Sequence, residues 1–148
     1  MSYQEKRTVV SLVSTILITV IYSLVMAQRY TATNPYSVEA FHFWGAFLLI
    51  LIPVSIVARI VIYIVFSIFN TIITKEKEPA FTDERDKLIE LKAARNSLYT
   101  FTAGFLLAMG SLVLDMPPNV MFILLICAGL MADVIGETSN LYFYRRGV

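Results

Sequence analysis

The chain has 148 residues, of which 57% are hydrophobic and 16% are charged, with a formal net charge of +1. Soluble domains are about 45–50% apolar, so this composition excludes an ordinary soluble protein, and the near-neutral charge excludes direct nucleic-acid binding, which needs a basic surface. A single cysteine and a single histidine exclude a disulfide framework and a Cys-based metal centre, so we expect no metal and no cofactor.

Four apolar segments fill most of the chain, at residues 8–27, 43–74, 97–114 and 119–139. About 20 apolar residues in a helix cross the hydrocarbon core of a bilayer. The first segment could be a cleaved signal peptide, but its apolar run exceeds the usual length of about 7–15 residues. We therefore predict an all-α integral membrane four-helix bundle, with residues 1–148 forming a single domain.

Lysine and arginine are distributed unevenly between the flanks of these segments. Lys6 and Arg7 precede the first segment, Arg145 and Arg146 follow the last, and further basic residues lie in the loop 75–96. The connection between the first two segments carries only Arg29, and the turn 115–118 carries none. Because basic residues mark cytoplasmic flanks, we predict cytoplasmic termini, a cytoplasmic loop 75–96 and a multi-pass protein of the cytoplasmic membrane.

The second segment is longer than a bilayer requires. Residues 43–74 would rise about 48 Å as a helix, against a hydrocarbon core of about 30 Å. The helix must therefore tilt, kink at Pro53 or extend into the cytoplasm.

The loop before the third segment carries its own helix signal. Thr82 or Asp83 can cap a helix, and neither glycine nor proline follows until Gly104. We predict one amphipathic cytoplasmic helix that continues into the third span. The alternative is a helix on the membrane surface that bends near Asn96.

Charged residues within the apolar segments mark the candidate site. Arg59 lies near the middle of the second segment, and Asp133 lies at a similar depth in the fourth. A charge there is costly without a partner, so we predict an Arg59–Asp133 ion pair, either within one chain or across a dimer. The alternative, given equal weight, is that such a pair only fixes the register of the bundle.

Further polar residues extend this intramembrane site. Glu137 lies one turn beyond Asp133, and Arg95, Lys92 or water could be its partner. The second segment adds Tyr63 and Asn70. We expect these polar side chains to face the bundle interior, because polar groups avoid lipid.

Small residues form two ridges at helical spacing. Ala128, Ala132 and Gly136 follow one another on the fourth segment, and Gly104 and Ala108 on the third. Such ridges let membrane helices approach closely. We expect one ridge to pack the hairpin of the last two spans and the other to be available for a homodimer.

Two stretches carry a family resemblance. They are the segment Thr82–Arg95 (TDERDKLIELKAAR) and the tail Leu141–Val148 (LYFYRRGV). Together they resemble a family of small, uncharacterised prokaryotic membrane proteins with a D-E-R-D-type motif before the penultimate helix and an aromatic-Arg-Arg tail. The resemblance implies pairing with a cytoplasmic regulatory protein, for which the motif supplies candidate contacts: Asp83, Glu84, Arg85, Asp86 and Arg95.

These features predict a function without assigning a reaction. We expect a non-enzymatic membrane protein that binds a protein partner, a membrane lipid or a small ligand. A regulatory role is among the roles that such binding allows. The alternative is a small transporter in which Arg59, Asp133 and Glu137 line a proton or ion path in a homo-oligomer. We expect no catalytic residues, because the chain contains no G-x-S-x-G, H-E-x-x-H or phosphate-binding glycine motif.

Overall fold

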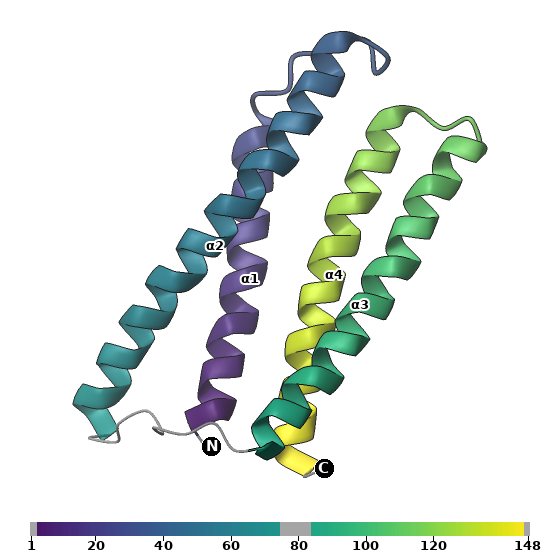
Figure 1. Ribbon diagram of the computed structural model, residues 1–148. Coiled ribbons are helices and arrows are strands. Elements are labelled where there is room, and N and C mark those ends of the chain that lie inside the picture. The colour runs from purple at the N-terminus through teal and green to yellow at the C-terminus, as the bar shows by residue number, and fades with distance from the viewer. Residues whose placement is uncertain (1–2, 75–83, 147–148) are drawn as a thin grey trace.

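The computed structural model describes residues 3–74 and 84–146. Four helices make up this part of the chain: α1 (Tyr3–Ala27), α2 (Val38–Thr74), α3 (Glu84–Val113) and α4 (Pro118–Arg146). They run up and down, so that the start of α1, the start of α3 and the end of α4 lie at one end of the molecule (Figure 1). We call this end the termini end and the opposite end the loop end. Asp83 and the rest of the first part of the predicted loop, residues 75–83, lie outside the described residues.

All four helices are long and apolar enough to cross a membrane, which indicates a multi-pass membrane protein. Each predicted apolar segment lies largely within one helix, and the helices extend beyond the segments mainly at the termini end. α2 has 37 residues and therefore rises about 55 Å. Pro53 lies inside it.

The predicted amphipathic helix and the third span are one element. α3 runs without a break from Glu84 to Val113. Its first turn carries Glu84 and Asp86, whose negative charges stabilise the positive end of the helix dipole. The alternative of a surface helix bent near Asn96 is therefore wrong.

α3 and α4 form the most closely packed part of the bundle. Ala108 on α3 and Ala128 and Ala132 on α4 are buried, and a Cβ atom added at Gly104 would lie 2.4 Å from the Cβ of Ala128. One added at Gly136 would lie 3.2 Å from the Cβ of Ser97. Both small-residue ridges are thus used inside this hairpin. The expectation that one ridge is left for a homodimer is wrong, because the two ridges pack against each other.

The other two helices pack more loosely around this hairpin. α1 packs against both α4 and α2, whereas α2 meets α4 at few positions and its described backbone does not approach that of α3. Figure 1 shows α2 and α3 on opposite sides of the view, with α1 and α4 between them. The bundle is therefore open on the side between α2 and α3.

Candidate functional site: an ion pair on the floor of a lateral groove

Arg59 and Asp133 form an ion pair between α2 and α4. The Nη2 atom of Arg59 donates to Oδ2 of Asp133 at 2.5 Å. The structure thus forms the expected pair within one chain. The two side chains are 39% and 42% exposed, so the pair is not enclosed by the bundle.

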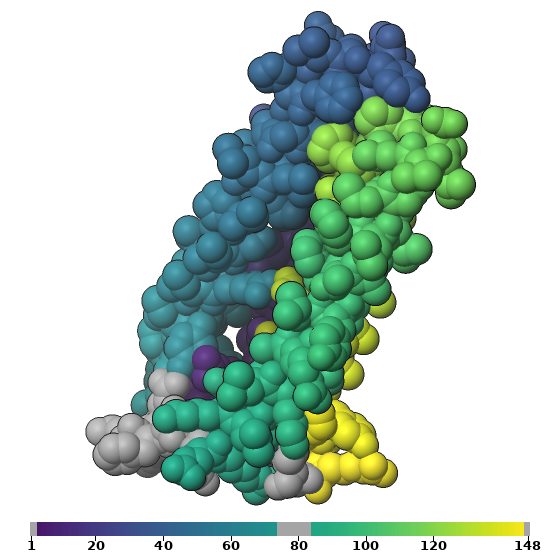
Figure 2. Space-filling model, turned by 45° about the vertical axis from the view of Figure 1, so that its right-hand side comes forward, coloured from purple at the N-terminus to yellow at the C-terminus, as the bar shows by residue number. Residues whose placement is uncertain are grey.

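The ion pair lies in a groove that follows the open side of the bundle. We call this cavity of about 760 Å³ the lateral groove. Figure 2 shows a hollow between α2 and α3, with atoms of α1 and α4 visible inside it. Most of its lining is aliphatic or aromatic, and the polar or charged lining residues are Thr19, Ser55, Arg59, Ser97 and Asp133.

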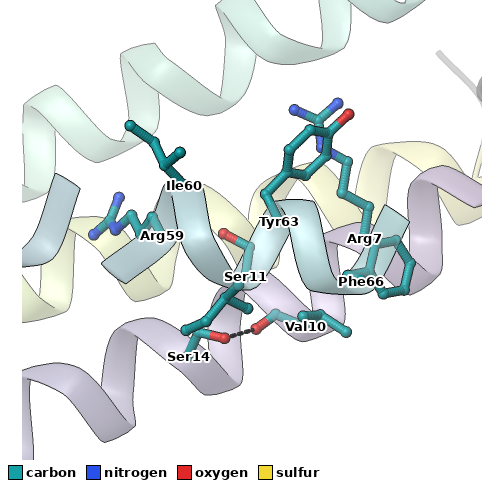
Figure 3. Close-up of a pocket in the computed structure, with 9 residues that line it drawn as sticks. Arg7, Val10, Ser11, Ser14, Arg59, Ile60, Tyr63 and Phe66 are labelled. Carbon is teal, nitrogen blue, oxygen red and sulfur yellow. Dashed lines mark hydrogen bonds between the residues drawn. The ribbon is translucent and has the colours of Figure 1, made fainter. Parts of the chain in front are cut away.

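The ion pair lies in the half of the bundle nearer the termini end. Asp133 is about 9 Å of helix rise from Ser139, where the apolar segment of α4 ends. Arg59 also lines a second cavity of about 260 Å³ between α1 and α2, together with Arg7 and Tyr63. The Arg7 guanidinium stacks over the Tyr63 ring at 4.7 Å, as Figure 3 shows.

Glu137 is held by α1. Ser11 donates a hydrogen bond to Oε1 of Glu137 at 2.5 Å. The expected partners Arg95 and Lys92 were therefore wrong, because α4 packs against α1 at this level. Arg95 is exposed on α3.

A third cavity opens near Glu137. It has a volume of about 140 Å³, and its charged lining residues are Arg7, Glu90 and Glu137. The second and third cavities share Arg7 and Ser11. Polar groups therefore extend from the termini end to the ion pair.

The remaining predicted members of the polar site have different positions. Tyr63 lines the second cavity, one turn from Arg59. Asn70 is 8% exposed and lies about three turns from Arg59 along α2. Asn70 lines none of the three cavities described above, so the structure does not bring it to the ion pair.

Aromatic side chains gather at the loop end of the bundle. Asn119 joins two of them: Trp44 donates to its Oδ1 atom at 2.9 Å, and its amide nitrogen donates to the Tyr30 hydroxyl at 2.9 Å. Trp44 also stacks on Phe122, with ring centroids 5.7 Å apart. We call these four residues and Phe47, whose ring contacts Trp44, the aromatic cluster.

The two stretches that carry the family resemblance touch each other. Burial and the nearby carboxylates of Asp86, in the first turn of α3, and Glu90 raise the pKa of Tyr144 in the tail to about 12. The Lys92 ammonium lies 5.9 Å from the centre of the Phe143 ring, a cation–π distance. Ile89, between them in sequence, is fully buried. Glu84 and Arg85 are exposed, so part of the motif packs on the tail and part remains on the surface.

Sequence reasoning did not identify several residues of the site. Ser11 repeats at helical spacing with Thr15 and Thr19, but serine and threonine in membrane helices often bond only their own backbone. Thr8 and Ser14 do so, to the carbonyl oxygens of Gln4 and Val10. The spacing alone could not show that Ser11 reaches Glu137 instead.

No family model, no protein of known function and no solved structure matches the chain. The resemblance of its second half to a prokaryotic family therefore stays a prediction. The functional argument rests on the geometry of the groove and the ion pair.

Proposed function

We propose that the protein is a non-enzymatic protein of the cytoplasmic membrane that binds an amphiphilic, lipid-like ligand in the lateral groove. The observation that carries this proposal is a half-exposed ion pair on the floor of a largely apolar groove that opens sideways. In a membrane, this opening faces the hydrocarbon chains of the lipids.

The size and lining of the groove suit such a ligand. Small-molecule sites have volumes of about 300–1,000 Å³ and combine apolar walls with a few polar groups, and the groove has about 760 Å³. A charged pair in contact with hydrocarbon is costly. A ligand that places a polar group beside Arg59 and Asp133 would lower this cost, and its chain would cover the apolar walls.

The distribution of basic residues supports a cytoplasmic termini end. Apart from Arg29 and Arg59, the basic residues of the described chain lie near this end, on the first turns of α1, the first turns of α3 and the last turn of α4, and basic flanks face the cytoplasm. Glu84, Arg85 and Arg95 are exposed at or near this end. They are the proposed contacts for a cytoplasmic regulatory protein, because Asp86 of the same motif lies beside the tail.

Transport is the second candidate, since polar residues reach from the termini end to the ion pair. Against it, the residues around the cavity at the loop end are mostly aromatic or aliphatic. A path through one chain would find few polar groups there to carry a proton or an ion. We therefore rank binding above transport; a gradient-driven proton or ion flux in proteoliposomes that Asp133→Asn abolishes would reverse this order.

Photo-crosslinking tests the binding proposal. The protein is placed in nanodiscs with a lipid that carries a diazirine on its acyl chain, and the labelled peptides are identified by mass spectrometry. Labelling should concentrate on groove residues such as Leu98 and Leu130. Uniform labelling of every exposed apolar surface would contradict the proposal, and crosslinks between two copies of the chain would assign the groove to a dimer.

The chain offers a matched pair of variants for this experiment. Gly129 lines the groove, and a Cβ atom added there meets nothing within 4 Å. Gly129→Leu should therefore fill the groove and remove the labelling without disturbing the bundle. Gly110 has equally open surroundings but does not line the groove, so Gly110→Leu should leave labelling unchanged.

A further inference from the structure

We propose that the ligand has an uncharged, oxygen-rich head group, which lies in the polar cavities of the termini half while its chain occupies the lateral groove. This inference rests on the proposed function and adds the chemical class of the ligand. The observation behind it is that Arg59 lines both the groove and the second cavity. We call the second and third cavities together the vestibule.

The vestibule and the groove form a continuous path around Arg59. The vestibule's two cavities share Arg7 and Ser11, and the inner one shares Arg59 with the groove. Figure 3 shows Ser11 and Ser14 of α1 across from Arg59 and Tyr63 of α2. A molecule with a polar head and an apolar chain could therefore bind with its head on the vestibule side of Arg59 and its chain on the groove side.

Two guanidinium groups, those of Arg7 and Arg59, line the inner cavity of the vestibule, and none of the described carboxylates does. The hydroxyl groups of Ser11 and Ser14 also line it. Because they already donate to Glu137 and to the Val10 carbonyl, they can accept a hydrogen bond from a ligand. The Arg59 Nε atom is buried and has no hydrogen-bond partner among the described residues. Buried polar groups normally have a partner. A head group with carbonyl or hydroxyl oxygens would provide one, either directly or through water.

The charges around this cavity disfavour a charged head. Glu90 and Glu137 line the outer cavity of the vestibule, and Asp133 already neutralises Arg59 from the groove side. Over the groove and both cavities of the vestibule, three carboxylates face two guanidinium groups, so an anionic head that reaches the outer cavity would meet a net negative charge. A cationic head would have to lie beside Arg7 and Arg59 in the inner cavity. Like charges in a site of low dielectric repel strongly, so an uncharged head is the one that fits both cavities.

The aromatic cluster assigns the head to the termini side. Asn119 ties Trp44 and Tyr30 together, and these residues line an apolar cavity at the loop end with Ser23, Phe43 and Cys127. That cavity offers little for a hydrated head group. The ligand should therefore enter from the leaflet at the termini end.

Competition between amphiphiles with one common chain tests the head-group class. Protein in nanodiscs is labelled by the diazirine lipid in the presence of a dodecyl glycoside, dodecyl phosphate or dodecyl trimethylammonium. We expect the glycoside to compete at concentrations at least tenfold lower than either charged compound. Equal or better competition by a charged compound would overturn the inference but leave groove binding intact. If no compound competes and Gly129→Leu does not reduce labelling, the proposed function itself fails.

A measurement of accessibility tests the vestibule without any ligand. In a Cys127→Ser background, Ser14→Cys and Ser23→Cys are treated in vesicles with a charged, membrane-impermeant methanethiosulfonate. Ser14→Cys should react only when the reagent is on the termini side, because Ser14 lines the inner cavity. Ser23→Cys should not react from that side, because Ser23 lines the cavity at the loop end. A Ser14→Cys that reacts only after denaturation, or a Ser23→Cys that reacts from the termini side, would overturn the proposal.

Discussion

Arg59 on α2 and Asp133 on α4 are paired within one chain, 74 positions apart in sequence, and both remain partly exposed to the lateral groove. The pair and the Trp44–Asn119 hydrogen bond are polar links between α2 and α4, whereas α2 packs chiefly against α1. The ion pair therefore has two consequences: it helps to set the position of α2, and it places a donor and an acceptor on the floor of the groove.

The first prediction concerns the energetic coupling of this pair. Arg59→Gln leaves Asp133 without its counterion, and Asp133→Asn does the same to Arg59. The losses of stability in the two single variants should therefore sum to more than the loss in the double variant. Because both side chains are more than one third exposed, we expect a coupling free energy of only about 1 kcal/mol.

A double-mutant cycle measures this coupling, with unfolding followed in mild detergent. Arg29→Gln is the control, because Arg29 is exposed in the connection between α1 and α2 and the change should leave the free energy of unfolding within error. Additive effects of Arg59→Gln and Asp133→Asn would show that the ion pair does not help to hold α2 in place.

The second prediction concerns the close approach of α3 and α4. Gly104→Ala places a methyl group 2.4 Å from the Cβ of Ala128, so the helices must separate or shift. We expect a loss of about 1–3 kcal/mol in the free energy of unfolding. Gly136→Ala should cost less, since its added Cβ lies 3.2 Å from that of Ser97.

Gly110→Ala is the matched control for both glycines. Nothing lies within 4 Å of a Cβ atom there, and alanine favours a helix over glycine by about 1 kcal/mol. Unfolding in detergent should therefore show an unchanged or slightly more stable protein. If Gly104→Ala were as stable as Gly110→Ala, the small-residue ridges would not determine the packing of this hairpin.

The four helices could be predicted from the sequence, because their existence depends on local hydropathy. The Arg59–Asp133 pair could also be predicted, since helix rise fixes the depth of each charge and an intramembrane charge needs a partner. How the two ridges are used could not be predicted. Spacing shows that small residues share one face of a helix, but it does not show which helix packs against that face. Both ridges proved to face each other.

The partner of Glu137 and the groove itself also lay beyond sequence reasoning. The Ser11–Glu137 hydrogen bond depends on how α1 and α4 are rotated about their axes. The groove exists because α2 packs on α1 and not on α3. A hydropathy pattern does not encode such tertiary packing.

The third prediction concerns the aromatic cluster. Asn119→Leu keeps the side-chain volume similar but removes the hydrogen bonds to Trp44 and Tyr30. Leaving their polar groups unpartnered should cost about 1–3 kcal/mol. Trp44 is the single tryptophan, so its fluorescence reports directly on this end of the bundle.

We expect the emission of Asn119→Leu to shift to longer wavelength, because water replaces the lost partner of the indole. Tyr30→Phe removes only the second hydrogen bond and should give a smaller loss of stability with little spectral change. Identical spectra for Asn119→Leu and the parent protein would mean that Asn119 does not organise the cluster.

The last prediction concerns the contact between the motif and the tail. Asp86 lies close enough to Tyr144 to contribute, with burial, to the raised pKa of that hydroxyl, and the fully buried Ile89 lies one turn further along α3. Asp86→Ala should therefore loosen the last turns of α4, and hydrogen exchange of residues 141–146 should become several-fold faster. Tyr144→Phe should have a similar effect, and the two changes together should add little to either one alone.

Glu84→Ala separates this contact from a general effect on the helix start. Glu84 and Asp86 both lie in the first turn of α3 and stabilise its positive end alike, but Glu84 is exposed. If Glu84→Ala speeds exchange in the tail as much as Asp86→Ala does, the effect comes from the helix dipole. If only Asp86→Ala does so, the motif holds the tail directly, and a partner that binds the exposed Glu84 and Arg85 would act on a platform that α3 and α4 build together.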